Sequence, residues 1–236
     1  DCIIKSFFIV TLSLPRDKIL KDRRFRLVLR HLTLLNTTNR NAPFLMISPP
    51  ALLTKTMLKF LNFSKPTQDD HAELKELFVS TITDTVRNEG EYIQNQEKVI
   101  QSGVEEQMMN LKYYFTNNDL VQHYLIAKSD SRIIGTIAYG KPSKLVSINV
   151  NSELTGIPEI KSLYILPSFQ KRGVGSLLFA EIITELRTRT SHYCLDCGYT
   201  KSQNFWKKKL GEPQYILKDY WSEGNDHMIW KLPIDS

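Results

Sequence analysis

The chain has 236 residues, of which 42% are hydrophobic and 24% charged, which is enough for one large domain or for a domain with an extension. No run of about 18 apolar residues occurs, so the sequence predicts no membrane-spanning helix. The apolar stretch 7–14 is followed by Pro15-Arg16-Asp17 rather than by the small residues of a signal-peptide cleavage site. The net charge of +6 lies in residues 1–50, which hold nine Lys or Arg and three acids, whereas residues 51–236 hold 22 of each sign.

Residues 1–50 are expected to form a basic N-terminal extension, helical in part over residues 17–35, ahead of a domain that covers residues 51–236. A basic stretch can bind nucleic acid or a membrane surface, or it can be a solvated face. This one has no interleaved stacking aromatics and no recognisable binding motif, so a solvated face is favoured. We therefore expect neither a membrane nor a nucleic acid as partner.

The chain has three cysteines, Cys2, Cys194 and Cys197, which are few for a disulfide-stapled secreted protein and suit a reducing cytosol. The CxxC spacing of the last two lies in a segment that reads as a short strand, where their side chains would face opposite sides. A structural zinc site needs about four ligands, and no second pair with ligand spacing is present. We expect a cytoplasmic protein with buried strand cysteines and no metal.

After Pro49-Pro50 the hydrophobic periodicity indicates a mixed α/β pattern. Residues 57–63 read as a strand, and residues 67–70 supply an N-terminal cap for a helix that runs to about Arg87. A second helix is predicted over residues 94–115. Its apolar stripe consists of Ile100, Val104, Met108 and Leu111.

Two strands are predicted next, over residues 123–127 and 132–139, joined by a polar turn as in a hairpin. Residues 141–158 are rich in Ser, Pro and Asn and are interpreted as a loop that shapes a substrate entrance. The remaining predicted elements are a strand over 159–166, a helix over 173–187, a strand over 192–196, a helix over 202–210, and strands over 214–217 and 227–232.

The residues with the clearest chemistry lie between positions 159 and 211. A strand that ends at Leu166-Pro167 is followed by a loop and by a helix that opens at Gly173-Val-Gly175. Backbone N–H groups then lie at the positive end of a helix, which favours an anion. Glycine lets the backbone take unusual angles close to a phosphate, and Lys171 and Arg172 add positive charge. An ordinary glycine-rich turn is the alternative.

Two other phosphate motifs fit poorly. A dinucleotide-binding GxGxxG needs a glycine where Leu178 stands, and its first glycine directly follows the strand. Asp196 does lie about twenty residues further on, as that motif requires. The long loop over 167–172 and the lack of repeated βαβ units argue against it, and no GxxxxGK[ST] sequence occurs.

The segment Gln170-Lys-Arg-Gly-Val-Gly175 resembles the [QR]xxGx[GA] motif of the GNAT superfamily. Phe205-Trp-Lys-Lys-Lys-Leu-Gly211 resembles the family's FYxKLG element, with Trp in place of Tyr and one extra residue. The resemblance covers roughly residues 57–233. It implies an α/β (α+β) fold, with a mixed, mostly antiparallel twisted sheet of six to seven strands flanked by about four helices.

The resemblance also implies that acetyl-CoA is the acyl donor. The main chain of the 159–166 strand would pair with the pantetheine arm like an extra strand, and strand 192–196 would splay away to admit it. Loop and helix amides would hold the pyrophosphate. The implied cofactor-binding residues are Leu163, Tyr164, Ile165, Gln170, Lys171, Arg172, Gly173, Val174, Gly175 and Ser176.

Attack on a thioester needs an amine that has lost its proton, and Glu159 is the candidate base. It stands eleven residues before Gln170, the spacing at which some relatives, including the histone acetyltransferase branch, keep a catalytic glutamate. The alternative is a surface carboxylate at a strand end. A main-chain N–H in the region 163–165 would meet the developing oxyanion.

The group that protonates the leaving thiolate stays unassigned. Trp206 stands where many relatives have Tyr, and an indole N–H is not a practical proton donor to a thiolate. Tyr199, Tyr215, Tyr220 or water could substitute. Trp206 is expected to pack, and lysines 207–209 are either a solvated helix face or a contact to the 3′-phosphate of the cofactor.

The sequence thus predicts an N-acetyltransferase that acts on a primary amine by direct attack in a ternary complex. A small-molecule amine is favoured because no added peptide-recognition module is visible. Two alternatives remain: an acyl-CoA-binding sensor without turnover, and nucleic-acid binding through residues 1–50. The second helix and the 141–158 segment are expected to line the acceptor side, and the extension could bridge a homodimer.

Overall fold

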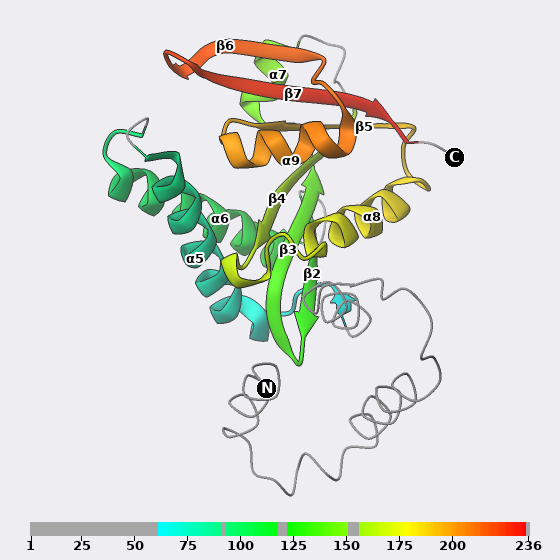
Figure 1. The fold of residues 1–236 in the computed structure, drawn as a ribbon. Coiled ribbons are helices and arrows are strands. Elements are labelled where there is room, and N and C mark those ends of the chain that lie inside the picture. The colour runs from blue at the N-terminus through cyan, green and yellow to red at the C-terminus, as the bar shows by residue number, and fades with distance from the viewer. Residues whose placement is uncertain (1–60, 91–92, 118–121, 151–155, 235–236) are drawn as a thin grey trace, which may run out of the picture. The chain divides into compact units, whose positions relative to one another are not determined.

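The fold was examined in a computed structural model, which describes residues 61–90, 93–117, 122–150 and 156–234 (Figure 1). The predictions for the basic extension 1–50, and for most of the 57–63 strand, lie outside these residues. In chain order the described elements are β1 (Asn62–Ser64), the 3₁₀ turn η1 (Gln68–Asp70), α5 (His71–Glu89), α6 (Gln96–Asn117), β2 (Gln122–Ser129), β3 (Arg132–Gly140), α7 (Lys144–Asn149), β4 (Glu159–Ile165), the 3₁₀ turn η4 (Pro167–Phe169), α8 (Val174–Leu186), β5 (His192–Cys197), α9 (Thr200–Leu210), β6 (Tyr215–Ser222) and β7 (Asn225–Pro233).

The seven described strands form one sheet in the order β1-β2-β3-β4-β5-β7-β6. Neighbouring strands within it are antiparallel except for β4 and β5, which run parallel. This confirms the predicted mixed, mostly antiparallel sheet. The structure describes five α-helices, one more than the sequence indicates.

Helices cover both faces of the sheet (Figure 1). Helix α5 packs against β3 and β4, α6 packs against β2, and α8 packs against β2, β3 and β4. Apolar residues three or four positions apart give α5 and α8 their buried faces. The most deeply buried members include Leu74, Leu77 and Phe78 of α5 and Leu178 and Ile182 of α8. Within the described residues, no helix is long and apolar enough to cross a membrane.

The predicted helix start at residues 67–70 is confirmed. The carboxylate of Asp70 accepts hydrogen bonds from the backbone N–H of Thr67 at 2.8 Å and from its hydroxyl at 3.2 Å. The ammonium of Lys128, on β2, lies 2.6 Å from the same carboxylate. Burial alone would raise the pKa of Asp70, but these partners outweigh it and the pKa is lowered. The cap thus ties the start of α5 to β2.

The 141–158 segment is not wholly a loop, and that prediction is wrong for residues 144–149, which form α7. The hydroxyl of Ser143 caps the helix by accepting the N–H of Val146 at 3.2 Å. Val146 and Val150 pack in a small second core with Cys194 of β5 and Ile229 of β7. A helix this short owes its stability to that packing, which composition does not reveal.

Candidate active site

Strands β4 and β5 pair over only two residues and then diverge. Glu159 lies opposite Cys194 and Ile160 lies opposite Leu195. Beyond them, β4 pairs with β3 alone among the described strands, through Lys161, Tyr164 and Ile165. The expected splay is therefore present, and it leaves one edge of β4 open to an extended ligand that could add to it like a strand.

The part of β4 beyond its junction with β5 carries a β-bulge. Thr136 and Ala138 of β3 pair with Tyr164 and Lys161, so two residues of β4 lie across from the single residue between them. Ser162 accordingly has a left-handed backbone, with φ of 53°. Its hydroxyl donates a hydrogen bond of 2.8 Å to the side-chain carbonyl of Gln107, on α6. The bulge leaves β4 main-chain groups out of the ladder at the opening, and the Ser162 side chain links this part of the strand to α6.

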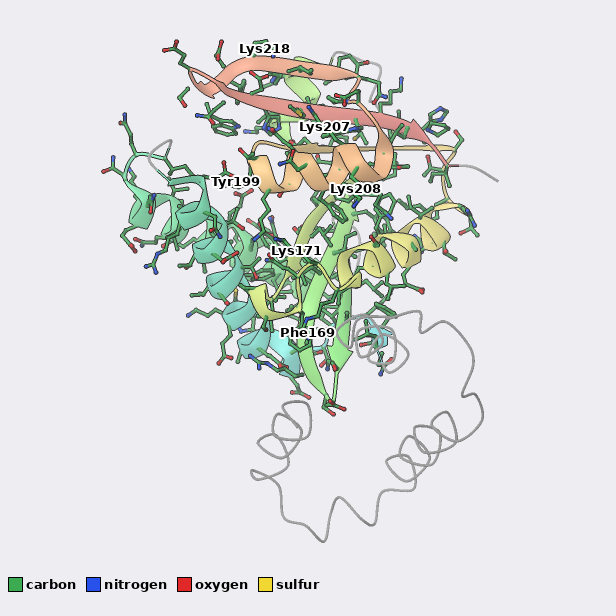
Figure 2. All side chains as sticks on the ribbon, in the orientation of Figure 1. Phe169, Lys171, Tyr199, Lys207, Lys208 and Lys218 are labelled. Atoms are coloured by element: carbon green, nitrogen blue, oxygen red, sulfur yellow. The ribbon has the colours of Figure 1, made fainter. Side chains whose placement is uncertain are left out.

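The loop after β4 ends in a helix start suited to an anion. The side-chain amide of Gln170 donates to the carbonyl of Ile165 at 3.0 Å, which fixes the loop to the strand end. Lys171 and the N-cap Gly173 have φ of 57° and 91°, and such left-handed residues turn successive N–H groups to one side. Figure 2 shows Lys171 on this loop, in front of β4.

The amides that open α8 have no acceptor within the helix. The first bond there runs from Leu177 N to Gly173 O at 3.1 Å, so the N–H groups of residues 174–176 point out of the helix end. The guanidinium of Arg172 lies 5.5 Å from the ring centroid of Phe169, which holds its charge beside the loop. These groups suit a pyrophosphate.

The two glycines of the motif differ in whether the backbone requires glycine at their positions. Gly173 needs its left-handed backbone, which a β-carbon disfavours, so Gly173→Ala is expected to lower the free energy of unfolding by about 1 kcal/mol. Gly175 is helical, and an added β-carbon would meet Ile165 and Phe205 at an ordinary 3.7 Å. Gly175→Ala should leave stability unchanged or raise it, because Ala favours helix. Urea unfolding of both variants measures the contrast, and equal losses would contradict it.

Glu159 is buried, so its interpretation as a surface carboxylate is wrong. Its exposed fraction is 2%, and its carboxylate accepts the backbone N–H of Ser143, which precedes α7. The ammonium of Lys161 lies 3.4 Å away and also donates to the carbonyl of Lys141 at 2.8 Å. Burial is the main cause that raises the pKa of Glu159. The Lys161 charge opposes this rise and that of Asp196 adds to it.

The face of the sheet that Glu159 occupies follows from strand register. Residues that pair across strands share a face, and alternate residues along a strand do too. Glu159 and Lys161 therefore lie on the same face as Cys194 and Asp196 of β5. Cys194 packs under α7, so this is the face that α7 covers.

Three tyrosines lie toward α6. They are Tyr124 of β2, Tyr164 of β4, and Tyr199, which lies between β5 and the start of α9. Burial raises the pKa of each, and the charge of Glu106 on α6 raises it further. The side chain of Tyr164 also packs edge-on against Phe78 of α5, with ring centroids 5.4 Å apart. Its side chain thus faces the α5 layer, while its main chain belongs to the open edge of β4.

The cysteines of the CxxC pair are free thiols. Cys194 is buried and Cys197 half-buried. Burial, followed by the charges of Glu159 and Asp196, raises the pKa of Cys194 to about 12, so the thiol is not a ready nucleophile. Within the described ranges, no three His, Cys, Asp or Glu side chains gather as metal ligands would.

The second motif places its aromatic residues in the core. Trp206 is buried, and its ring centroid lies 5.2 Å from that of Phe179 and 4.8 Å from that of Phe205. This confirms the predicted packing role. Lys207 lies 3.5 Å from the carboxylate of Glu212, and Figure 2 shows Lys207 and Lys208 on α9.

An open strand edge, a helix start suited to an anion and a buried carboxylate at the strand junction together form a site suited to acyl transfer. The sequence profile of the Acetyltransferase (GNAT) family matches residues 91–211. The chain belongs to the GNAT acetyltransferase family. A search of curated proteins found no significant match.

Solved structures give the same fold. PaiA N-acetyltransferase from Thermoplasma acidophilum, in complex with coenzyme A, is 17% identical, covers 73% of this chain and 99% of its own, and has a TM-score of 0.53. YncA from Salmonella typhimurium, with acetyl-CoA, is 14% identical, covers 75% of this chain and 95% of its own, and has a TM-score of 0.54. The ribosomal-protein-alanine N-acetyltransferase from Brucella melitensis is 19% identical, covers 73% of this chain and 99% of its own, and has a TM-score of 0.53. At these identities the likeness concerns the fold alone.

Proposed function

We propose that this chain is an N-acetyltransferase that transfers the acetyl group of acetyl-CoA to a primary amine of a small molecule, by direct attack in a ternary complex. The observation that carries the proposal is Glu159. A buried carboxylate with a raised pKa lies where β4 and β5 part. Such a group can take a proton from an ammonium near neutral pH.

The residues present fit acetyl-CoA, which supplies an activated thioester. The open edge of β4 at residues 163–165 would hydrogen-bond to the pantetheine arm. The amides of residues 170–176 would hold the pyrophosphate, with Lys171 and Arg172 beside them. The main chain at the bulge after Ser162 has groups free of the ladder, so an N–H there would stabilise the oxyanion of the reacting carbonyl.

In this scheme the acceptor reaches Glu159 from the face that α7 covers. Glu159 removes a proton from the ammonium, and the neutral amine forms the C–N bond. The C–S bond then breaks, and the leaving thiolate takes up the proton that the new amide nitrogen loses. Lys161 keeps Glu159 oriented through its contacts with the carboxylate and the Lys141 carbonyl. A protein amine is the alternative acceptor.

Among the three tyrosines considered as the acid, Tyr199 has the best position. Tyr215 and Tyr220 lie on β6, which is separated from β5 by β7, whereas Tyr199 directly follows β5 at the opening (Figure 2). We expect Tyr199→Phe to lower kcat about tenfold to a hundredfold and to leave coenzyme A affinity unchanged. Steady-state kinetics measures this, with Tyr220→Phe as the matched control. Equal activity of both variants would leave water as the acid.

Thiol release in the presence of acetyl-CoA tests the function. The amine panel holds polyamines, amino acids, aminoglycosides and peptides, and calorimetry with coenzyme A runs alongside it. Saturable binding together with turnover of one amine class is expected. Binding without turnover over the whole panel would favour the acyl-CoA sensor. Absence of coenzyme A binding at micromolar protein would overturn both.

A further inference from the structure

A buried histidine on β7 belongs to no role described so far. His227 is 4% exposed and makes a hydrogen bond at each ring nitrogen. The indole Nε1–H of Trp221, on β6, donates to its Nδ1 at 3.1 Å. Its Nε2 lies 3.1 Å from Oδ2 of Asp196, at the end of β5.

These two contacts fix the protonation state of the imidazole. An indole nitrogen only donates, so Nδ1 of His227 must be an acceptor and carries no proton. The proton of the neutral ring then resides on Nε2 and is donated to Asp196. In this tautomer the ring donates a hydrogen bond to the Asp196 carboxylate but brings no positive charge to it.

The neighbouring glycine is what lets Trp221 reach the histidine. A β-carbon on Gly198 would lie 2.5 Å from Nε1 of Trp221 and 3.1 Å from Nδ1 of His227. Any side chain there would displace the indole from the histidine. Trp221 is 60% exposed, so burial does not hold its ring. The ring is held by the hydrogen bond to His227 and by ring contacts with Tyr220 and His227.

The carboxylate of Asp196 acts on Glu159, the candidate base. Asp196 stands two residues beyond Cys194, the partner of Glu159, and on the same face of the sheet. Strand spacing and rise place the two α-carbons about 8 Å apart. Two carboxylates at such range repel one another. Burial is the main cause of the raised pKa of Glu159, and the charge of Asp196 adds to it.

We propose that the chain Asp196–His227–Trp221 is a positioning device for the proposed acetyl transfer: it holds an uncompensated carboxylate beside Glu159 and thereby strengthens Glu159 as the base. This inference rests on the proposed function only for its catalytic consequence. Asp196 and His227 are positioning residues in this scheme, since they act through Glu159 and need not touch the substrate.

Other charged and polar groups lie around both carboxylates. Lys161 and the N–H of Ser143 oppose the repulsion at Glu159. Around Asp196 lie His227 and the two thiols of the CxxC pair, and the charges of Lys161 and Lys207 act on those thiols. The ring of Tyr220 completes the surroundings of the histidine.

The first test follows the titration of Glu159 directly. In protein labelled with ¹³C at glutamate side chains, the Glu159 signal is assigned by its loss in Glu159→Gln. Asp196→Asn keeps the size and a polar contact to His227 but removes the charge, so the Glu159 midpoint should move to lower pH. This readout needs no turnover, so it stands even if the proposed acetyl transfer fails. An unmoved midpoint in a variant with parental thermal unfolding would overturn the proposal.

The second test removes the indole donor. Trp221→Phe lets Nδ1 of His227 take a proton, so an imidazolium pairs with Asp196 and the Glu159 midpoint should again move to lower pH. In the Asp196→Asn background, Trp221→Phe should add nothing. Additive shifts would overturn the chain, as would ¹⁵N spectra of the parent at neutral pH that show Nδ1 of His227 protonated.

Once an amine substrate has been found, the same variants can be tested by steady-state kinetics. Asp196→Asn is expected to lower kcat/KM at neutral pH about three- to tenfold and to move the acid limb of its pH profile to lower pH. The control is Tyr220→Phe, which keeps the ring beside His227 and should match the parent. A loss of activity without movement of the acid limb would indicate a merely structural role and overturn the proposal.

Discussion

Glu159→Gln is expected to lower kcat about 10²- to 10⁴-fold, which is the usual contribution of a positioned general base. The amide keeps the shape of the side chain and can still accept the Ser143 N–H, but it cannot take a proton. Affinity for coenzyme A should not change, because the implied binding groups lie on β4 and the start of α8. Steady-state kinetics and calorimetry measure the two quantities.

Two further variants separate the base from other effects. Glu159→Asp retains the carboxylate but withdraws it by one methylene, so it should recover part of the lost rate. Glu181→Gln removes an exposed carboxylate of α8 and should behave as the parent. If Glu159→Gln turns over at the parental rate, Glu159 is not the base and its buried carboxylate has a structural role only.

The raised pKa of Glu159 also predicts how the stability of the protein depends on pH. The pKa of Glu159 is raised above its ordinary 4.5 in the folded protein, so the folded state holds this proton more tightly than the unfolded chain. Its contribution to stability is then present at low pH and is lost as pH rises through the folded pKa. Relative to Glu159→Gln, the parent should therefore lose stability as pH rises above 4.5, and urea titrations of both proteins at several pH values measure it. A difference that does not vary with pH would contradict a raised pKa.

The sequence predicts those parts of the site that are local in the chain. The strand, loop and helix from position 159 to 187 follow from periodicity and from glycines at the helix start, and their observed bounds differ by a residue or two. The sheet class follows from the family resemblance. Trp206 was expected in the core and lies there, because an aromatic residue on an amphipathic helix has few other places to pack.

Contacts between distant segments could not be predicted. The burial of Glu159 depends on Ser143 and α7, whose sequence has too few residues for a helical period to show. The bulge at Ser162 has no glycine to signal it. His227 meets Asp196, and Trp221 meets His227, only through the register of β5, β6 and β7. Lys161, two residues from Glu159 on the same strand, was the one partner that strand alternation alone would have found.

Ser176→Asp is expected to weaken coenzyme A binding at least a hundredfold while stabilising the fold. Ser176 is the third residue after the N-cap Gly173, where a carboxylate accepts free helix N–H groups and complements the helix dipole. That gain is about 0.3–1 kcal/mol of unfolding free energy. The carboxylate would occupy the amides proposed for the pyrophosphate and would repel it.

The opposite signs of the two effects make this prediction specific. Ser176→Asn has nearly the same size without the charge and should lose far less affinity, so the difference between the variants isolates the electrostatic part. Pantetheine lacks the pyrophosphate, so its weak binding to β4 should be the same in both. Calorimetry with coenzyme A and with pantetheine, beside urea unfolding, measures all of these quantities. Equal losses for both ligands would mean that Ser176 disturbs β4 rather than an anion site. Undiminished coenzyme A binding would place the pyrophosphate away from the start of α8, because a fixed negative charge cannot share those amides with it.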